Sequence, residues 1–253
     1  MKKFDGWSIE KTMDFAKQHY ETKKIFTGEL LFDHCVTVAK QAEVIAARIY
    51  QDVRLDFMPD NTKDSISAIT QAAVLHDVLN VSACAFEHIA ETTTVQIAAM
   101  VADISRDFRL VETKRDMEFR GRLSQSPVGS QIIVAADVIC TARDLLTGLA
   151  KHGLVAVPKA KKILTQLDGD LLALHAANRY YMLRMFVHAA RNMLSDVSQK
   201  IKDHRQQAKM DKIVAQTTKR LREKIESEKK AKIKAKKKEV HYARKRTPEP
   251  DVE

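Results

Sequence analysis

Apolar residues recur at helical spacing through most of the chain. Between residues 33 and 54, Val36, Ala39, Ala42 and Ala46 lie three or four positions apart, which is typical of a helix with one buried face. The same spacing predicts further helices over residues 8–20, 65–79, 86–91, 94–103 and 128–149, and one that begins at Pro158 and has Gly169 near its end. Residues 112–123 are charged with little apolar face. Three polar residues are expected as N-caps of these helices: Ser8, Asp33 and Asp64.

Glycine and proline are scarce, with 7 and 5 residues, whereas Ala, Leu, Lys, Glu and Gln are plentiful. This composition indicates an all-α protein. From about residue 200 the apolar residues thin out, and no helix breaker occurs between Gly169 and Pro248, so a long charged helix is expected there. The expected organisation is a helical domain over residues 1–195, followed by a basic, helical or partly disordered tail over residues 196–253.

The charge of the chain is concentrated in this tail. The formal net charge is +10, but residues 1–200 hold 25 Lys and Arg against 24 Asp and Glu, whereas residues 201–253 hold 18 against 9. Such a tail can contact nucleic-acid phosphates without sequence preference, although only Tyr242 lies nearby for base stacking. A solvated helix, or an end that folds on a protein partner, is the stronger interpretation. The body therefore needs its own explanation.

Several classes of protein are disfavoured by the sequence. No apolar run reaches the ~20 residues that span a bilayer, and the N-terminus lacks the features of a signal peptide. The three cysteines, Cys35, Cys84 and Cys140, are widely spaced and include no Cys-x-x-Cys pair. Their spacing suggests neither a disulfide framework nor a thiolate zinc site. We therefore expect a cytoplasmic protein with no membrane partner.

Candidate chemistry begins with the adjacent pair His76 and Asp77, near the end of a long apolar helix. Burying both without partners costs stability, and a shared metal ion would satisfy both. His34 starts another helix, and Asp137 lies inside an apolar one, where a carboxylate needs a partner. The alternative is a core histidine bonded to a backbone carbonyl and an aspartate at a helix end, with no metal.

A wider pattern surrounds these residues. The segments that carry it, in order, are Ala16 to Ala39 with His19, Gly28, Glu29 and His34; Ala72 to Asp77; Phe86 to Ile89; Glu112 to Arg115; and Ser126 to Leu146 with Asp137. In order and spacing, residues 12–148 resemble the hydrolase domain of the Rel/Spo-type alarmone (ppGpp) 3′-pyrophosphohydrolases, which are HD-type metal-dependent phosphohydrolases. The resemblance implies an HD-domain helical bundle of the small, stand-alone type.

The resemblance also implies a metal site. His34, His76, Asp77 and Asp137 would hold one divalent ion, typically Mn²⁺ in this family, which would polarise a pyrophosphate oxygen and acidify a bound water. Asp77 would also belong to the catalytic group.

The resemblance likewise implies the substrate side of the site. Lys114 and Arg115 would lie where the family neutralises phosphate charge. Lys24 would lie next to the position of the family's guanine-stacking arginine, which is Ile25 here, and Thr141 replaces a family asparagine. The implied ligand is a nucleotide.

The sequence departs from the family at its acid/base equipment. A Glu-Asp pair follows the His-Asp motif in the family, whereas Asn80 and Val81 stand here. Neither side chain takes up a proton, and losing a general base typically costs ~10²–10⁴-fold in rate. Asp103 and Asp107 are the nearest acidic candidates for replacement, but a solvated loop explains both better. Glu87 matches an acidic family position and so compensates for nothing.

Three interpretations follow. The domain is an active phosphohydrolase on a nucleotide phosphate or pyrophosphate, with ppGpp the leading guess. Alternatively, it is a catalytically degenerate relative that binds metal or nucleotide as a regulatory or interaction module. In the third interpretation the site is vestigial and the tail carries the function. We favour the first, in which Asn80 occupies the position of the lost glutamate.

Overall fold

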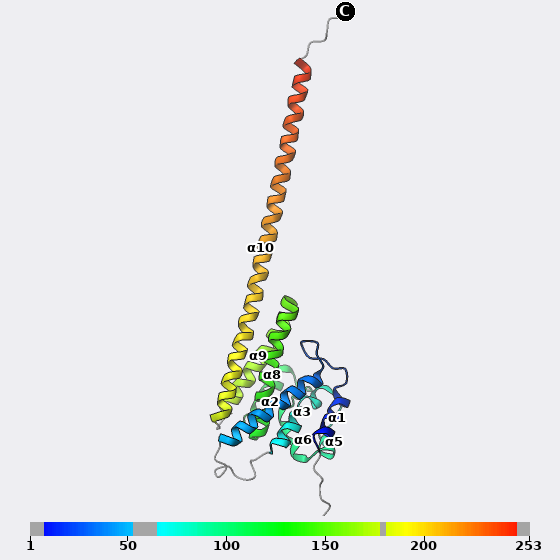
Figure 1. Ribbon diagram of the computed structural model, residues 1–253, viewed down its shortest axis with the longest axis vertical. Helices are drawn as coiled ribbons and strands as arrows, with labels where there is room; N and C mark the ends of the chain where they lie inside the picture. Colours follow the sequence, from blue (N-terminus) through cyan, green and yellow to red (C-terminus); the bar gives the residue numbers. More distant parts are fainter. Residues whose placement is uncertain (1–7, 53–64, 178–180, 247–253) are drawn as a thin grey trace, which may run out of the picture. The chain divides into compact units, whose positions relative to one another are not determined.

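The computed structural model describes residues 8–52, 65–177 and 181–246 (Figure 1). The helices are α1 (Ile9–Tyr20), α2 (Leu31–Asp52), α3 (Ile66–Val74), α4 (Val78–Val81), α5 (Phe86–Thr92), α6 (Val95–Ile104), α7 (Glu112–Leu123), α8 (Val128–His152), the 3₁₀ helix η3 (Gly153–Ala156), α9 (Val157–Ala177) and α10 (Tyr181–Arg246). The predicted all-α class is confirmed. The chain divides into two compact units, Met1–Lys202 and Asp203–Glu253.

The core of the first unit is built around α2, which packs against both α3 and α8 (Figure 1). Fully buried aliphatic side chains fill these contacts, among them Ile45, Ile69, Ile132 and Ile133. Burying a side chain of this size stabilises the fold by about 1.5–3 kcal/mol. The three elements that carry His34, His76 and Asp137 are therefore fixed against one another by apolar packing.

Helix α2 begins two residues earlier than the sequence indicates. Lys24 and Leu30 form an isolated antiparallel bridge, and the Leu31 amide donates to the Lys23 carbonyl at 2.8 Å. This small hairpin-like turn delivers the chain into the helix at Leu31. The expectation that Asp33 is the N-cap is therefore wrong, because Asp33 lies in the first turn of α2. Its negative charge still stabilises the helix there, since it lies near the positive end of the helix dipole.

The predicted helix over residues 65–79 is two helices. α3 ends at Val74, α4 begins at Val78, and His76 and Asp77 lie in the turn between them. The periodicity of apolar residues runs through this break because both sides of it are buried. Ser65 caps α3, since its hydroxyl accepts from the Ala68 amide at 3.0 Å. The other expected cap, Asp64, lies outside the described residues.

Gly169 does not mark the end of a helix, since α9 continues through it to Ala177. A Cβ atom at this position would lie 2.1 Å from Nη2 of Arg120. The glycine therefore allows the Arg120 guanidinium to pass close over α9 and reach Asp170, which it contacts. The close approach of the Arg120 side chain, rather than the end of a helix, explains why a glycine stands at position 169.

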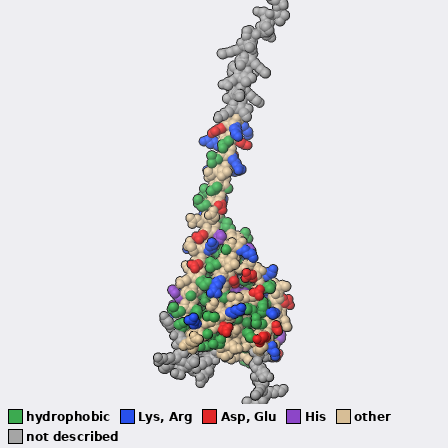
Figure 2. All heavy atoms as spheres, in the orientation of Figure 1, with side chains coloured by type: hydrophobic (Ala, Val, Ile, Leu, Met, Phe, Trp, Pro, Cys, Tyr) green, Lys and Arg blue, Asp and Glu red, His purple; other side chains and the backbone are tan. Residues whose placement is uncertain are grey.

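The second unit is described as far as Arg246 and is helical there as the last part of α10. Every described side chain from residue 211 to residue 230 is exposed. Charged side chains of both signs lie along this segment (Figure 2). None of the described helices combines the length and apolar character needed to cross a membrane.

Candidate metal centre

His34 from α2, His76 from the α3–α4 turn and Asp137 from α8 meet at one point. One ligand atom from each lies within 4.8 Å of the other two. Nε2 of His34 is 3.2 Å, and Nε2 of His76 is 3.8 Å, from the same Oδ1 of Asp137. Both imidazoles are buried, whereas the Asp137 side chain is 31% exposed. Three of the four predicted ligands are thus brought together from distant parts of the chain.

The other ring nitrogen of each histidine, Nδ1, makes a hydrogen bond on the side away from the cluster. Nδ1 of His34 lies 2.8 Å from Oδ2 of Asp144, and Nδ1 of His76 lies 2.9 Å from the Ala73 carbonyl oxygen. A carboxylate and a carbonyl only accept, so both Nδ1 atoms donate. Both Nε2 atoms therefore face the cluster. Metal-ligating histidines are oriented in this way by outer carboxylates and carbonyls. The metal-free alternative, a core histidine bonded to a backbone carbonyl, fits only His76. It does not explain why the His34 ring converges on the same point.

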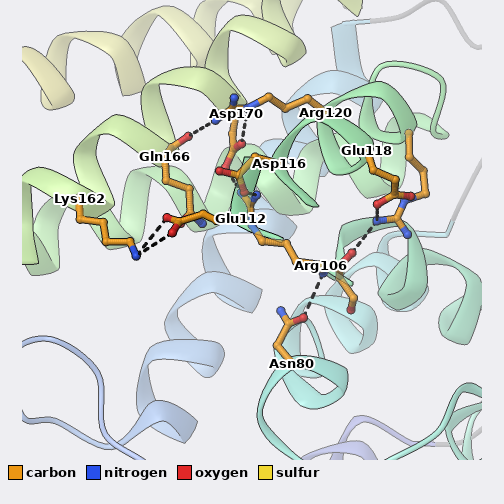
Figure 3. Close-up of polar contacts among 11 residues, drawn as sticks. Asn80, Arg106, Glu112, Asp116, Glu118, Arg120, Lys162, Gln166 and Asp170 are labelled. Atoms are coloured by element: carbon orange, nitrogen blue, oxygen red, sulfur yellow. Dashed lines mark hydrogen bonds and ion pairs between the residues drawn. The ribbon is translucent and has the colours of Figure 1, made fainter. Parts of the chain in front are cut away.

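Asp77 lies beside this cluster. Its Oδ2 is 3.8 Å from Nε2 of His76, and its Oδ1 accepts a hydrogen bond from Nδ2 of Asn80 at 2.9 Å. Oδ1 of the Asn80 side chain in turn accepts from the Arg106 backbone amide at 3.1 Å (Figure 3). Both ends of the Asn80 amide are therefore used to orient Asp77 and to tie the α3–α4 turn to the segment after α6.

Helix α8 presents three polar side chains on one face. Asp137, Thr141 and Asp144 follow one another at i, i+4 and i+7, which places them one above the other along the helix. The Thr141 hydroxyl donates to Oδ1 of Asp137 at 3.0 Å, and Asp144 holds His34. Sequence reasoning gave no role to Asp144. Its spacing from Asp137 on the same helix was the signal that could have found it.

The electrostatics of the cluster couple its histidines to its carboxylates. Burial alone lowers the pKa of His34, but its hydrogen bonds to Asp137 and Asp144 raise that pKa to about 10. Burial alone raises the pKa of Asp137, but the hydrogen bond from His34 and the charges of His34 and His76 lower it to about 2. In the metal-free protein His34 is therefore a cation that neutralises the carboxylates, and a divalent ion would replace its proton.

A cleft of about 780 Å³ opens above the cluster. Lys23, Lys24 and Thr141 line it, together with His34, His76, Asp77, Asn80 and Asp137. Its described lining does not include Lys114 or Arg115. Lys114 is exposed on α7, and the Arg115 guanidinium lies 4.7 Å over the ring of Phe108, which does line the cleft. The basic side chains in the described lining are thus Lys23 and Lys24 before α2 and Arg106 after α6, and none comes from α7.

Arg106 and Asp170, which line another part of the cleft, belong to an ion network with Asp116 and Arg120 (Figure 3). Arg106 pairs with Asp116 at 2.6 Å and with Asp170, and Arg120 donates to Asp170 at 3.2 Å. Burial raises the pKa of Asp170, while the two guanidinium groups act in the opposite direction. Sequence reasoning missed this network. A carboxylate inside an apolar helix, the feature that pointed to Asp137, also describes Asp170.

The acidic residues considered as replacements for the missing Glu-Asp pair lie elsewhere. Asp103 accepts from the Ser130 hydroxyl at 2.9 Å, Asp107 pairs with Arg109 at 2.8 Å, and Glu87 is exposed on α5. None of them belongs to the described lining of the cleft. The carboxylates that do line it are those of Asp77, Asp137, Asp144 and Asp170.

The fold has a counterpart among solved structures. No protein-family model matches the sequence, and no curated protein matches it at a significant level. The structure is similar to that of a metazoan ortholog of SpoT that hydrolyses ppGpp, with a TM-score of 0.54 and 15% sequence identity, over 72% of this chain and 92% of that one. At this identity the likeness concerns the fold alone.

Proposed function

We propose that the first unit is a metal-dependent phosphohydrolase of the HD type that acts on a nucleotide phosphate or pyrophosphate, with ppGpp as the first substrate to test. The observation that carries the proposal is the convergence of two oriented imidazole Nε2 atoms and the Asp137 carboxylate at the wall of an open cleft. The likeness of the fold to a ppGpp hydrolase supports the same class.

The donor set suits a divalent transition metal. Imidazole nitrogens together with carboxylate oxygens bind Mn²⁺, Fe²⁺ or Zn²⁺, and Mn²⁺ is our choice because carboxylates favour it. Asp77, which lies 3.8 Å from His76, is the fourth candidate ligand. When bound, such an ion supplies Lewis acidity and lowers the pKa of water in the site.

The chain itself supplies orientation and charge. Lys23 and Lys24 at the cleft provide cations for the phosphates of a nucleotide. Asn80 keeps the Asp77 carboxylate aimed into the cleft, because its amide nitrogen donates to Oδ1 of Asp77. In the absence of the Glu-Asp pair, Asp77 is the carboxylate we assign to accept the proton of the attacking water.

The test is release of phosphate or pyrophosphate from ppGpp and a panel of nucleotides by the Mn²⁺-loaded full chain. We expect turnover on at least one of them, and a loss of about 10²-fold or more in Asp137→Asn. The matched control Asp14→Asn, at an exposed position on α1, should behave as wild type. No turnover on any nucleotide would overturn the enzymatic proposal.

One observation favours a second candidate function. The Asn80 amide is hydrogen-bonded at both ends and Val81 is apolar, so the usual acid/base pair is replaced by residues that orient rather than transfer protons. A degenerate HD domain that binds metal or nucleotide as a regulatory module fits this. Stoichiometric nucleotide binding without turnover, measured by calorimetry, would favour it over the enzyme.

The basic tail is proposed separately to bind nucleic acid or an acidic protein partner. Its side chains from residue 211 to residue 230 are exposed, and it carries most of the net charge of the chain. Binding to nucleic-acid phosphates falls steeply with salt. Retention of the full chain on DNA should therefore fall from low to high salt, and deletion of residues 205–253 should abolish it. Unchanged retention would exclude the tail as a nucleic-acid arm.

A further inference from the structure

A second group of metal-ligating side chains lies outside the cleft. His19 in the last turn of α1, Cys84 before α5 and His88 on α5 place one ligand atom each within 4.8 Å of the others. Sγ of Cys84 is 3.9 Å from Nδ1 of His88, and the two imidazole centroids are 5.9 Å apart. None of these residues lines the described part of the cleft.

Local structure explains why the three meet. Cys84 and His88 are four residues apart across the start of α5, so they lie on the same side of its first turn. The ring of Phe15, one turn before His19, packs at 4.4 Å from the His19 ring and at 5.2 Å from the His88 ring. This aromatic contact brings α1 against α5 and holds both imidazoles beside the thiol.

The ligand chemistry is that of a soft or borderline divalent ion. A thiolate with imidazoles selects Zn²⁺, with Zn–S of about 2.3 Å and Zn–N of about 2.0 Å. Around a tetrahedral ion these bond lengths put sulfur and nitrogen about 3.5 Å apart. The observed 3.9 Å between Cys84 and His88 is within a small rotamer adjustment of that separation.

We propose that His19, Cys84 and His88 form a second metal site, distinct from the His34–His76–Asp137 cluster, which binds a thiophilic divalent ion such as Zn²⁺ with three protein ligands and one position for water. On binding, the Cys84 S–H bond breaks, its proton leaves to solvent and the thiolate pair of electrons forms the bond to the ion. Both imidazoles bind as neutral donors, and nothing is oxidised or reduced.

The pKa shifts of His19 and Cys84 agree with this geometry. Burial and the neighbouring His88 lower the pKa of His19, so its ring offers a lone pair at neutral pH. Burial raises the pKa of the Cys84 thiol, so the thiol is protonated until an ion displaces the proton. The sequence suggested no thiolate zinc site because it has no Cys-x-x-Cys pair. The structure brings one cysteine to two histidines, one of them far away in the sequence.

A consequence concerns the segment after the first cluster. Cys84 follows the α4 turn that carries Asn80, and α4 contacts α1. An ion shared by α1 and α5 would therefore brace the chain that leaves the His76–Asp77 turn. Binding of Zn²⁺ should raise the melting temperature of the full chain even when the first cluster is disabled.

The experiment uses Co²⁺ as a spectroscopic probe, added to the reduced full chain. A thiolate bound to Co²⁺ gives a charge-transfer band in the near ultraviolet, whereas imidazole and carboxylate ligands give none. We expect one Co²⁺ per chain to give this band, and Zn²⁺ to displace it. The band should persist in His34→Ala, which disables the first cluster, and should disappear in Cys84→Ser.

Two further variants keep the test decisive if Cys84→Ser fails to fold. His88 is exposed, so His88→Gln should fold and should weaken the Co²⁺–thiolate site at least about tenfold, since loss of an outer partner alone costs that much. The exposed His175→Gln is the matched control and should bind as wild type. A wild-type chain with no charge-transfer band, or a band unaffected by both Cys84→Ser and His88→Gln, would overturn the proposal.

Discussion

Nδ1 of His34 lies 2.8 Å from a carboxylate oxygen of Asp144, two helical turns beyond Asp137 on the same face of α8. This contact decides which ring nitrogen of His34 faces the cluster. Helix α8 supplies the candidate ligand Asp137 and also Asp144, which orients the candidate ligand His34. One helix therefore positions two of the three clustered ligands. The contact between His34 and Asp144 is stronger support for a metal centre than the His76-Asp77 dipeptide in the sequence.

Replacing Asp144 by asparagine should therefore weaken metal binding without changing the donor set. The amide cannot hold the His34 ring as strongly, and loss of such an outer partner typically costs about 10–100-fold in affinity. Titration of Asp144→Asn with Mn²⁺ measures this. Asp168→Asn, at an exposed position of α9, is the control. An affinity for Mn²⁺ equal to that of wild type would contradict the assigned role.

Metal affinity should rise with pH. The folded-state pKa of His34 is raised to about 10, so below that value the metal-free site holds a proton that the ion must displace. The association constant should increase about tenfold per pH unit for each proton displaced. Mn²⁺ titrations at pH 6.5, 7.5 and 8.5 test this. An affinity independent of pH over that range would contradict the protonated state assigned to His34.

The stability of the metal-free protein depends on pH with the opposite sign to metal affinity. A raised histidine pKa stabilises the fold fully below the unfolded value of 6.5, and this contribution is lost as pH rises toward 10. The metal-free protein should therefore lose stability between pH 7 and pH 10, and saturating Mn²⁺ should reduce that loss. Chemical denaturation with and without Mn²⁺ measures both effects.

Asp170 should be critical for folding. Its side chain is 5% exposed and accepts from both Arg106 and Arg120. Asp170→Ala leaves the buried Arg106 guanidinium short of a counter-charge, which typically costs about 3–5 kcal/mol. Urea unfolding should show this loss, and the exposed neighbour Asp168→Ala should change the free energy of unfolding little. A loss below about 1 kcal/mol for Asp170→Ala would contradict the network's structural role.

Asn80→Asp tests the amide that holds Asp77. The new carboxylate would face Oδ1 of Asp77 at a position now occupied by a donor 2.9 Å away. Like charges at this distance raise a carboxyl pKa, so the metal-free variant should be about 1–2 kcal/mol less stable at pH 7. The difference should shrink as pH falls below 5 and a proton enters the pair. A pH-independent difference would point to altered packing instead.

The sequence predicted what depends on local periodicity and composition. The helices around residues 8–20, 86–91 and 94–103 appear where apolar spacing placed them, because each buries one face on the core. The pair His76 and Asp77 was identified as adjacent polar residues near the end of an apolar helix. His34 at the start of another helix was added next, together with Asp137, because a charge in an apolar helix needs a partner.

What the sequence did not predict depends on contacts between distant segments or on local hydrogen bonds that leave no pattern. The break at His76 is hidden because apolar residues continue on both sides of it. The Arg106–Asp170 pair joins residues 64 positions apart, so only the packing of α9 reveals it. His19 and Cys84 are likewise brought together only by the contact of α1 with its neighbours.

The most direct test is the stoichiometry of Mn²⁺ on the full chain. Equilibrium dialysis followed by elemental analysis should find one tightly bound Mn²⁺ in wild type and in Cys84→Ser, because the second cluster prefers thiophilic ions. In His34→Ala, affinity should fall by at least about tenfold. No bound Mn²⁺ in wild type, or equal binding in His34→Ala, would contradict the assignment of His34, His76 and Asp137 as a metal centre.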